Sequence, residues 1–397
     1  GVYKNYPKIN ENEFVAITNV GAYGSSLSSN YNTRPLVAEI LINKNKFKLK
    51  ISEDDYQNID NLLKNNIFNL EKDKLFQIVY CKNDNKLICL FHDLIIDGKT
   101  VLVFFDKLSN IYNCFINKKL PKINKNDYYK QNYQYNIDNL RNFISKDNFI
   151  EFPIEKPNNF SFDEDRIYYS IDNKLYSKIK DFVKIKKITI FQLMQSVLFL
   201  IINKYSEKKY ICIDSIFDCS KNNSIGLYNN TVLIPFSFND FNITIEQYIE
   251  KIKNNNKIIM DNKDIPLEYL INKLDLKSLP NIRIHFEYIN KKTKFMFGDT
   301  SISSKFMENT SNVIRQLFWF NFGVHKNYIK TYISFRKNLF NKNSIIEMKN
   351  NILQVLNIIL DKNIKLNELI SNIKIKSKFN YKIKNKIDYR FLAYKYS

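Results

Sequence analysis

The stretch Lys86-Leu-Ile-Cys-Leu-Phe-His-Asp-Leu-Ile-Ile-Asp-Gly98 carries the clearest local signal in the chain. Its first part is an apolar run typical of a buried strand, and this strand leads directly into His92. Asp97 can fix a loop by hydrogen bonds, and Gly98 permits a sharp bend, so the stretch predicts an active-site loop. A strand-to-helix turn in which Asp97 only caps the next helix fits these residues equally well.

Strand and helix patterns continue on both sides of this stretch. Upstream, Ser52 is a suitable N-cap for a helix whose first turn is acidic. A strand hairpin then precedes the loop, and a helix follows it. The predicted elements are a helix at 53–70, strands at 74–81 and 86–91 around the turn 82–85, a helix at 99–115, and a connector with short helices at 117–165.

The second half of the chain alternates strand-like and helix-like segments. Thr189 and Thr244 each stand where an N-cap of an amphipathic helix is expected. Strands that alternate with helices favour an α/β layered fold. The predicted strands are 168–171, 210–217, 231–238, 282–288, 317–322 and 328–336, and the predicted helices are 173–183, 189–205, 244–256 and 344–360.

The composition is that of a globular protein with a strong positive charge: 44% of the residues are hydrophobic, 25% are charged, and the net charge is +21. Such a charge raises the question of a nucleic-acid partner. Most of the positive residues are lysines spread among Asn, Ile, Tyr and Phe, a mixture that AT-rich codons encode. Arginine is sparse, and no zinc-finger, RNA-recognition or basic-zipper pattern occurs. We therefore expect no specific nucleic-acid binding.

The cysteines and histidines limit the redox and metal chemistry. The five cysteines, at 81, 89, 114, 212 and 219, include no Cys-x-x-Cys pair, and an odd count suits a reducing cytoplasm. Histidine occurs only at 92, 285 and 325, so metal ligands are scarce. The apolar run 188–202 is too short and too polar for a membrane span. We predict a cytoplasmic protein without a metal site or a membrane segment.

Residues 1–52 have a different character. Strand-like segments at 13–18 and 36–42 enclose a stretch rich in glycine and serine, residues that permit close approach of the backbone to a ligand. The chain begins at Gly1 and not at Met, so we expect the natural N-terminus to lie upstream.

Several segments resemble, in the same order, the condensation domains of nonribosomal peptide synthetases. The stretch from His92 to Gly98 is similar to the family's His-His-x-x-x-Asp-Gly motif, with the first His, the Asp and the Gly retained. The resemblance covers about residues 60–370, and the shared order speaks against chance. The other matching segments are Ile67–Leu75, Thr189–Leu193, Ile225–Pro235, Asp264–Glu268 and Tyr332–Phe340.

The chain departs from the family at the position that carries the chemistry. Asp93 replaces the second His, which in the family lies at the middle of a tunnel where the acceptor amine meets the donor thioester. An unperturbed Asp has a pKa near 3.9 against about 6.5 for His, so Asp is the poorer base near neutral pH, although burial can raise its pKa. The spacing also differs from that of heterocyclisation domains, and a family Arg expected near Cys219 is absent.

Residues 1–52 are similar to the C-terminal end of diaminopimelate decarboxylase, an enzyme that uses pyridoxal phosphate (PLP). The matching segments are Gly21-Ala-Tyr-Gly24, Ser29-Asn-Tyr-Asn-Thr-Arg-Pro35 and Ala38-Glu-Ile-Leu41. The Tyr of this block contacts the cofactor and substrate in that family, which implies a cofactor-binding role for Tyr23. The alternative is that Tyr23 packs in a β-barrel. The catalytic Lys block of that family is missing here, so we expect the chain by itself not to hold PLP.

Together the two resemblances imply the fold and the domain organisation. The expected fold is the α/β, two-lobed, chloramphenicol-acetyltransferase-like fold of condensation domains, preceded by a short β-rich segment from a PLP decarboxylase barrel. The implied domains are an incomplete decarboxylase tail at 1–52, an incomplete first condensation lobe at 53–165, the second lobe at 166–372, and a basic tail at 373–397.

The condensation resemblance also implies a site and a reaction, in which an acyl thioester and an amine form an amide bond. The thioester would be carried by the phosphopantetheine of an acyl or peptidyl carrier protein, the amine would be a small amine or amino acid, and the chain itself would need no cofactor. A complete upstream decarboxylase would need PLP. The alternative is a non-catalytic module that docks a carrier protein. The implied site residues are His92 and Asp93 for catalysis, Asp97 and Gly98 for the structure of the motif, and Asn230 and Thr231 along the tunnel.

Overall fold

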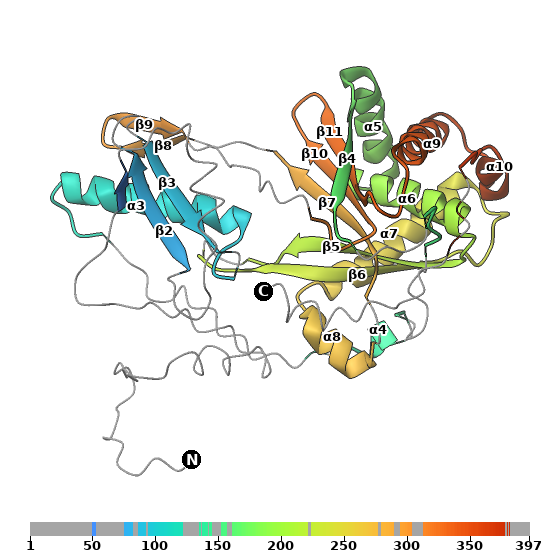
Figure 1. Cartoon of the computed structure of the whole chain (residues 1–397), viewed down its shortest axis with the longest axis horizontal. Coiled ribbons are helices and arrows are strands. Elements are labelled where there is room, and N and C mark those ends of the chain that lie inside the picture. The colour runs from blue at the N-terminus through green and yellow to red at the C-terminus, as the bar shows by residue number, and fades with distance from the viewer. Residues whose placement is uncertain are drawn as a thin grey trace, which may run out of the picture. The chain divides into compact units, whose positions relative to one another are not determined.

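The fold is described from a computed structural model of the chain, which divides into two compact units (Figure 1). The first unit consists of residues 1–103, 123–133 and 222–227, and the second of residues 104–122, 134–221 and 228–397. The predicted strands at 13–18 and 36–42, the helix at 53–70, the turn at 82–85, Tyr23 and Asp93 lie outside the described residues. The structure describes residues 50–52, 75–81, 86–92, 94–121, 135, 137–141, 143–144, 152–156, 161–220, 224–276, 279–289, 294–303, 313–377, 379 and 381.

The first unit contains a small sheet with the predicted hairpin. Strands β2 (Phe76–Cys81) and β3 (Lys86–Phe91) pair antiparallel, with Phe76 opposite Phe91. The short strand β1 (Lys50–Ser52) pairs parallel to β2. Helix α3 (Gly98–Ile116) begins six residues after His92 and confirms the helix predicted after the motif.

The second unit is built on one six-stranded sheet with the strand order β4-β11-β10-β7-β5-β6. The central strand β7 is parallel to both of its neighbours, and all other neighbouring strands are antiparallel (Figure 1). Every strand predicted after residue 166 is present, with bounds that differ by a few residues. The strands are β4 (Glu164–Ile171), β5 (Tyr210–Asp218), β6 (Asn229–Ser237), β7 (Ile282–Tyr288), β10 (Phe318–Val324) and β11 (Ile329–Arg336).

One face of this sheet is covered by helices and holds the large core. Alternate residues of a strand point to the same face, and Ile213, Ile284 and Phe320 all belong to this core. The buried centre of the helix layer is α6, whose predicted cap Thr189 accepts a hydrogen bond from Gln192 N at 3.1 Å. The helices with residues in this core are α5 (Asn173–Lys186), α6 (Ile190–Ser206), α7 (Ile245–Asp261), α9 (Lys342–Asp361) and α10 (Leu366–Ser371).

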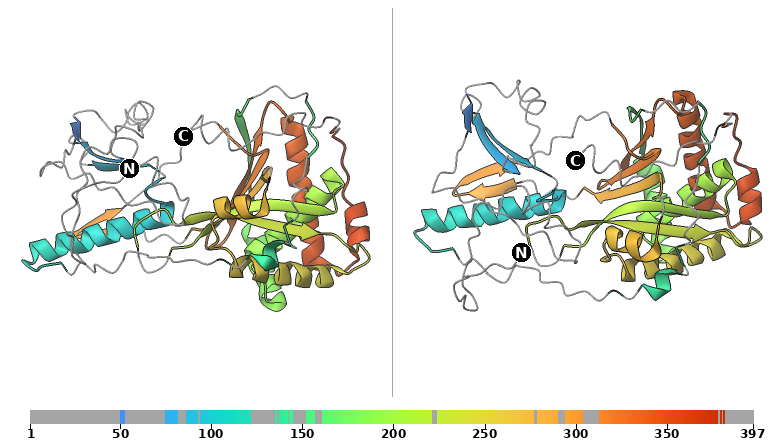
Figure 2. Two further views of the ribbon diagram at one scale, coloured as in Figure 1. Left: turned by 90° about the horizontal axis from the view of Figure 1, so that it is seen from below. Right: turned by 60° about the horizontal axis from the view of Figure 1, so that its bottom comes forward.

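The opposite face of the sheet carries a smaller apolar cluster at the β5–β6 end. Cys212 and Leu233 point to this side and pack with Leu140 of α4 (Asp138–Arg141) and Leu270 of α8 (Leu267–Leu274). Figure 2 shows α8 beside the yellow-green strands from a second and a third direction. The second unit is therefore an α/β layered structure, as predicted.

The second unit also contains a hairpin that was not predicted from the sequence. Strands β8 (Lys294–Phe297) and β9 (Thr300–Ser303) are joined by Gly298 and Asp299, with Gly298 at φ 60°. A Gly-Asp pair between strand-like residues is a recognised hairpin signal. The hairpin packs on α3, where Asn113 accepts a hydrogen bond from Gly298 N at 2.6 Å and donates one to Met296 O at 2.9 Å.

Two predicted domain boundaries fall inside the second unit. Phe152 and Ile154, from the predicted connector before residue 166, are fully buried in the large core. Ile154 also exchanges two backbone hydrogen bonds with Tyr381, at 2.9 and 3.0 Å. Ile373 is buried in the same core, and Phe379 packs against it. The start of the predicted basic tail thus contributes to the core through Ile373, whereas Lys374 and Lys376 are exposed.

Candidate functional site

His92 stands at the end of β3 and begins the motif loop, which we define as residues 92–100. Its backbone N–H donates to Leu75 O at 2.8 Å, and its carbonyl accepts from Ile95 N at 3.0 Å. The imidazole Nδ1 accepts a hydrogen bond from the Leu94 backbone N–H at 3.0 Å. A ring nitrogen that accepts such a bond carries no proton, so neutral His92 has its proton on Nε2. His92 can therefore donate from Nε2 but is not free to act as a base through Nδ1.

Asp97 is the N-cap of α3. Its Oδ1 accepts hydrogen bonds from Thr100 N at 2.9 Å and from Lys99 N at 3.2 Å, and the residue is buried. These two N–H groups belong to the first turn of the helix, which has no intrahelical acceptors for them. Asp97 therefore caps a helix, as one of the two interpretations from the sequence proposed. The same hydrogen bonds also fix the end of the motif loop.

Thr100 ties the motif loop to a distant segment of the chain. Its Oγ1 donates to the carbonyl of Gly226 at 2.6 Å, and Asp97 N approaches the same carbonyl at 3.2 Å. Thr100 is fully buried. Residues 222–227 belong to the first unit, whereas the residues on either side of them belong to the second. The sequence analysis did not single out Thr100, although Gly226 lies in the matching segment Ile225–Pro235.

Gly98 does not make the sharp bend that the sequence predicted. It is the first residue of α3, and the described residue with a positive φ at a glycine is Gly298, not Gly98. A Cβ added to Gly98 would meet no described heavy atom within 4 Å. The bend is made instead by the turn at Leu94 and Ile95 and by the cap of Asp97. The space beside Gly98 is therefore not required for packing within the described chain.

Asp93 follows His92 in the motif loop, whereas Asn230 and Thr231 lie on β6. Asp93 and Tyr23 lie outside the described residues. His92, Asp97 and Gly98 belong to the first unit, and Asn230 and Thr231 belong to the second. The cleft that these residues were predicted to share stays a prediction.

Asn230 fastens the start of β6 to the loop that precedes α8. It lies opposite Phe217 of β5, and its side-chain amide donates to Lys263 O and to Ile265 O, both at 2.7 Å. Both amide hydrogens of Asn230 are thus used within the second unit. Thr231, the next residue of β6, pairs with Ile216 and is half-buried.

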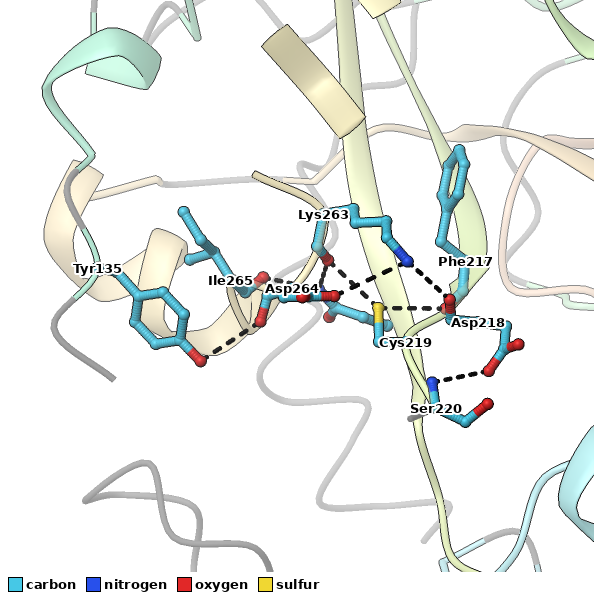
Figure 3. A network of polar contacts seen from close by, with 9 residues as sticks. Tyr135, Phe217, Asp218, Cys219, Ser220, Lys263, Asp264 and Ile265 are labelled. Atoms are coloured by element: carbon cyan, nitrogen blue, oxygen red, sulfur yellow. Dashed lines mark hydrogen bonds and ion pairs between the residues drawn. The ribbon is translucent and has the colours of Figure 1, made fainter. Parts of the chain in front are cut away.

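A network of polar contacts surrounds this loop at the end of β5 (Figure 3). Lys263 Nζ donates to Asp218 O at 3.0 Å, and Cys219 Sγ lies 3.5 Å from Lys263 O. Tyr135 donates to Asp264 O at 3.3 Å. In this chain, backbone carbonyls near Cys219 accept these contacts from Lys263, Cys219 and Tyr135.

The cysteines with perturbed pKa values are not suited to nucleophilic catalysis. Burial, followed by the nearby Asp264, raises the pKa of Cys219 to about 12. Burial raises the pKa of Cys89 to about 11 and that of Cys212 well above its usual value. The thiolate is the reactive form, so these three side chains stay protonated and unreactive near neutral pH.

In the described parts of the chain, no group of three or more His, Cys, Asp or Glu side chains is placed to hold a metal ion. In the same ranges, no single helix is long and apolar enough to cross a membrane. Helices α5 and α6 pass that test only as a pair bent by 100°.

The chain belongs to the condensation domain family, which it matches over residues 37–382. Surfactin synthase subunit 2 of Bacillus subtilis is 23% identical to it over 255 residues, which are 59% of this chain and 7% of that protein. Bacitracin synthase 1 of Bacillus licheniformis is 21% identical over 52% of this chain and 4% of its own length. The chain thus spans only a small part of these relatives.

Solved structures confirm the fold. The X-domain from teicoplanin biosynthesis, in complex with OxyB, has a TM-score of 0.63 at 13% identity, with 82% of this chain and 79% of that chain covered. The epimerization domain from the third module of tyrocidine synthetase B has a TM-score of 0.57 at 13% identity, over 82% and 80% of the two chains. The predicted two-lobed condensation-type α/β fold is therefore confirmed.

A shorter similarity concerns diaminopimelate decarboxylase. The enzyme of Buchnera aphidicola subsp. Schizaphis graminum is 47% identical over 45 residues, which are 11% of each chain. This likeness is partial, and the decarboxylase origin of residues 1–52 stays a prediction.

Proposed function

We propose that the chain catalyses amide-bond formation between a carrier-bound acyl thioester and an amine, as a condensation domain of a peptide-synthetase assembly. The amine nitrogen attacks the thioester carbonyl, the C–N bond forms, the C–S bond breaks, and the proton of the amine leaves with the thiol. The observation that carries the proposal is the motif loop, in which Asp97 caps α3 and Thr100 binds the carbonyl of Gly226. The family membership supports it.

His92 and Asp93 are the proposed catalytic residues, with unequal roles. His92 orients a partner through its Nε2–H, since its Nδ1 is engaged by Leu94 N. Asp93 occupies the position of the second family His and weakens catalysis, because an ionised carboxylate stabilises an ammonium nucleophile in its unreactive form. Asp97 and Gly98 maintain the motif, and Asn230 and Thr231 line the tunnel.

A second candidate function is favoured by Asp93 itself. A domain that lacks the second His can retain the fold and serve only to dock a carrier protein, downstream of a PLP-dependent decarboxylase that supplies an amine. In that arrangement Tyr23 belongs to the PLP site of the upstream enzyme. The condensation unit needs no cofactor in either candidate, and the phosphopantetheine belongs to the carrier. We further propose a cytoplasmic location, from the odd cysteine count, and no specific nucleic-acid or membrane partner.

The test is an amide-formation assay with a carrier-bound acyl donor and a panel of small amines. We expect slow product formation by the native chain, and a further loss in His92→Ala. A further variant is Asp93→Ala, which removes the carboxylate of the proposed site. Its matched control is Asp106→Ala, which removes the carboxylate of an exposed aspartate on α3. Binding of the loaded carrier is measured separately by calorimetry. Carrier binding without product from any variant would favour the docking module, and a lack of both would contradict both candidates.

A further inference from the structure

Four polar and aromatic side chains from three central strands meet on the face of the second sheet opposite to the large core. We call them the sheet-face cluster: Asp214 of β5, Arg283 and His285 of β7, and Trp319 of β10. The neighbours Ile213, Ile284 and Phe320 point the other way, into the core. The register places Arg283 opposite both Asp214 and Trp319.

A buried ion pair forms the base of the cluster. Arg283 Nε donates to Asp214 Oδ1 at 2.5 Å, and its Nη2 donates to Asp214 Oδ2 at 3.3 Å. The side chains of Arg283 and Asp214 are 15% and 5% exposed. A two-bond pair of this kind holds the guanidinium in a fixed plane and cancels the charge of both groups.

Two aromatic rings pack on this pair. The guanidinium carbon of Arg283 lies 5.7 Å from the centre of the Trp319 ring. The His285 ring meets Trp319 edge-on, with the centroids 5.9 Å apart and the planes at 83°. Trp319 of β10 is thus held by two side chains of β7, the guanidinium of Arg283 and, two residues further along, the imidazole of His285.

Each of the two rings has a nitrogen that lacks a hydrogen-bond partner among the described residues. The Nε1 of Trp319 and the Nδ1 of His285 are both shielded from solvent. Most buried polar atoms in proteins are hydrogen-bonded, and leaving one without a partner costs about 1–3 kcal/mol. Two rings in contact thus each carry a nitrogen with unused hydrogen-bonding capacity, and a ligand that reached both with one acceptor and one donor would gain two bonds.

The charge of the cluster selects a neutral ligand. The ion pair has no net charge, and burial and then the charge of Arg283 lower the pKa of His285 to about 4, so its ring is neutral near pH 7. An added anion or cation would remain uncompensated in this buried setting, which is costly. An amide fits because it is neutral and carries one acceptor and one donor, a carbonyl and an N–H that point in opposite directions in the trans form.

We propose that Trp319 and His285 bind an amide group of the substrate, whose carbonyl accepts from Trp319 Nε1 and whose N–H donates to His285 Nδ1. This inference rests on the proposed function for the source of the amide. The pantetheine arm of the thioester donor and the backbone of a peptidyl acyl chain both carry amides. Arg283 and Asp214 are positioning residues that hold the indole.

The chain contains a single tryptophan, so its fluorescence reports on this cluster directly. The full chain is titrated with pantetheine, with N-acetylglycine N-methylamide and with an amide-free thiol of matched length, and calorimetry supplies a second readout. We expect a saturable change with at least one amide probe and none with the amide-free thiol. A response to pantetheine alone assigns the amide to the carrier arm, and a response to the peptide probe assigns it to the acyl chain.

The variant His285→Phe keeps the reporter and removes Nδ1. We expect it to weaken binding about fivefold, the effect of one neutral hydrogen bond. His325→Phe is the matched control, because His325 stacks on Tyr328 at 4.3 Å near the β10–β11 turn, away from the cluster. Equal affinities of the native chain and His285→Phe, or an equal response to the amide-free thiol, would overturn the proposal.

The titration uses neither a carrier protein nor an amine, so it is independent of catalysis. A chain that binds the amide probe but forms no product would contradict the proposed catalysis and leave the binding site standing. A chain that forms product, remains folded by thermal unfolding and gives no signal in fluorescence or calorimetry would overturn the binding site alone.

Discussion

The motif loop and the sheet-face cluster hold their polar groups in opposite ways. In the motif loop the bonds are mostly local: Asp97 contacts Lys99 and Thr100, and His92 contacts Leu94. In the sheet-face cluster Arg283 reaches Asp214 across 69 positions of the chain, and two nitrogens have no partner among the described residues. The described bonds of the loop fix its own backbone, whereas the cluster holds polar groups that the proposed amide would satisfy.

The largest expected effect concerns position 93 of the loop. Asp93→His restores a group that can accept a proton from the amine or orient it, and we expect amide formation to rise about a hundredfold to ten-thousandfold. The measurement is the rate with a carrier-bound acyl donor and small amines. A native chain that already turns over well, with Asp93→Ala unchanged, would show that position 93 is not the site.

The next effect concerns the ion pair of the cluster. Asp214→Ala leaves Arg283 buried without its counter-charge, and we expect the free energy of unfolding to fall by about 3–5 kcal/mol. Urea unfolding of the second unit is followed through Trp319 fluorescence. The matched control Asp361→Ala breaks the exposed pair with Lys178 and should cost at most about 1 kcal/mol. Equal losses in the two variants would mean that burial does not distinguish these pairs.

His285 should make the second unit sensitive to acid. The pKa of His285 is lowered to about 4 in the folded chain, against about 6.5 when unfolded, so the unfolded chain binds more protons between these values. The contribution of neutral His285 to the free energy of unfolding is present above about pH 6.5. It is lost as the pH falls to about 4, which lowers the free energy of unfolding by about 3 kcal/mol. The variant His285→Phe should lose this part of the pH dependence. Unfolding curves at several pH values give the free energy of unfolding of the native chain and of His285→Phe. The same pH dependence in both would refute the role of His285.

Thr100 tests a long-range bond of the motif loop, the one that its hydroxyl makes to Gly226 O. Thr100→Val keeps the shape and removes the hydroxyl that donates to Gly226 O, and we expect a loss of about 1–2 kcal/mol. Hydrogen exchange of the peptides that contain residues 97–101 and 224–228 should become faster together. Thr100→Ser, which retains the hydroxyl, should restore slow exchange. Fast exchange in only one of the two peptides would show that they are not coupled.

The smallest expected effect is that of Gly98→Ala. The added methyl meets no described atom within 4 Å, and alanine favours the helix, so stability should change by less than about 1 kcal/mol. Thermal unfolding checks the stability, and the amide-formation assay checks the function. A variant that stays folded but loses activity would show that the substrate uses the space beside Gly98.

Local patterns determined much of this protein. The apolar run before His92, the caps Thr189 and Thr244 and the strand–helix alternation after residue 166 were sufficient to predict β3, α6, α7 and the α/β class. These signals lie within a few residues of the elements that they specify, so they can be read without the fold. The ordered motifs identified the family on the same basis.

Only the tertiary structure decided which distant residues meet. Asp214, Arg283 and Trp319 carry no local motif, and they form one cluster because parallel strands align at positions that the sequence does not mark. The bond from Thr100 to Gly226 arises in the same way. Gly98 permits a sharp bend, but it begins α3 without a positive φ, so the backbone does not use that freedom. Short-range preferences are encoded by neighbouring residues, whereas the pairing of strands and the polar groups that they bring together depend on the packing of the whole sheet.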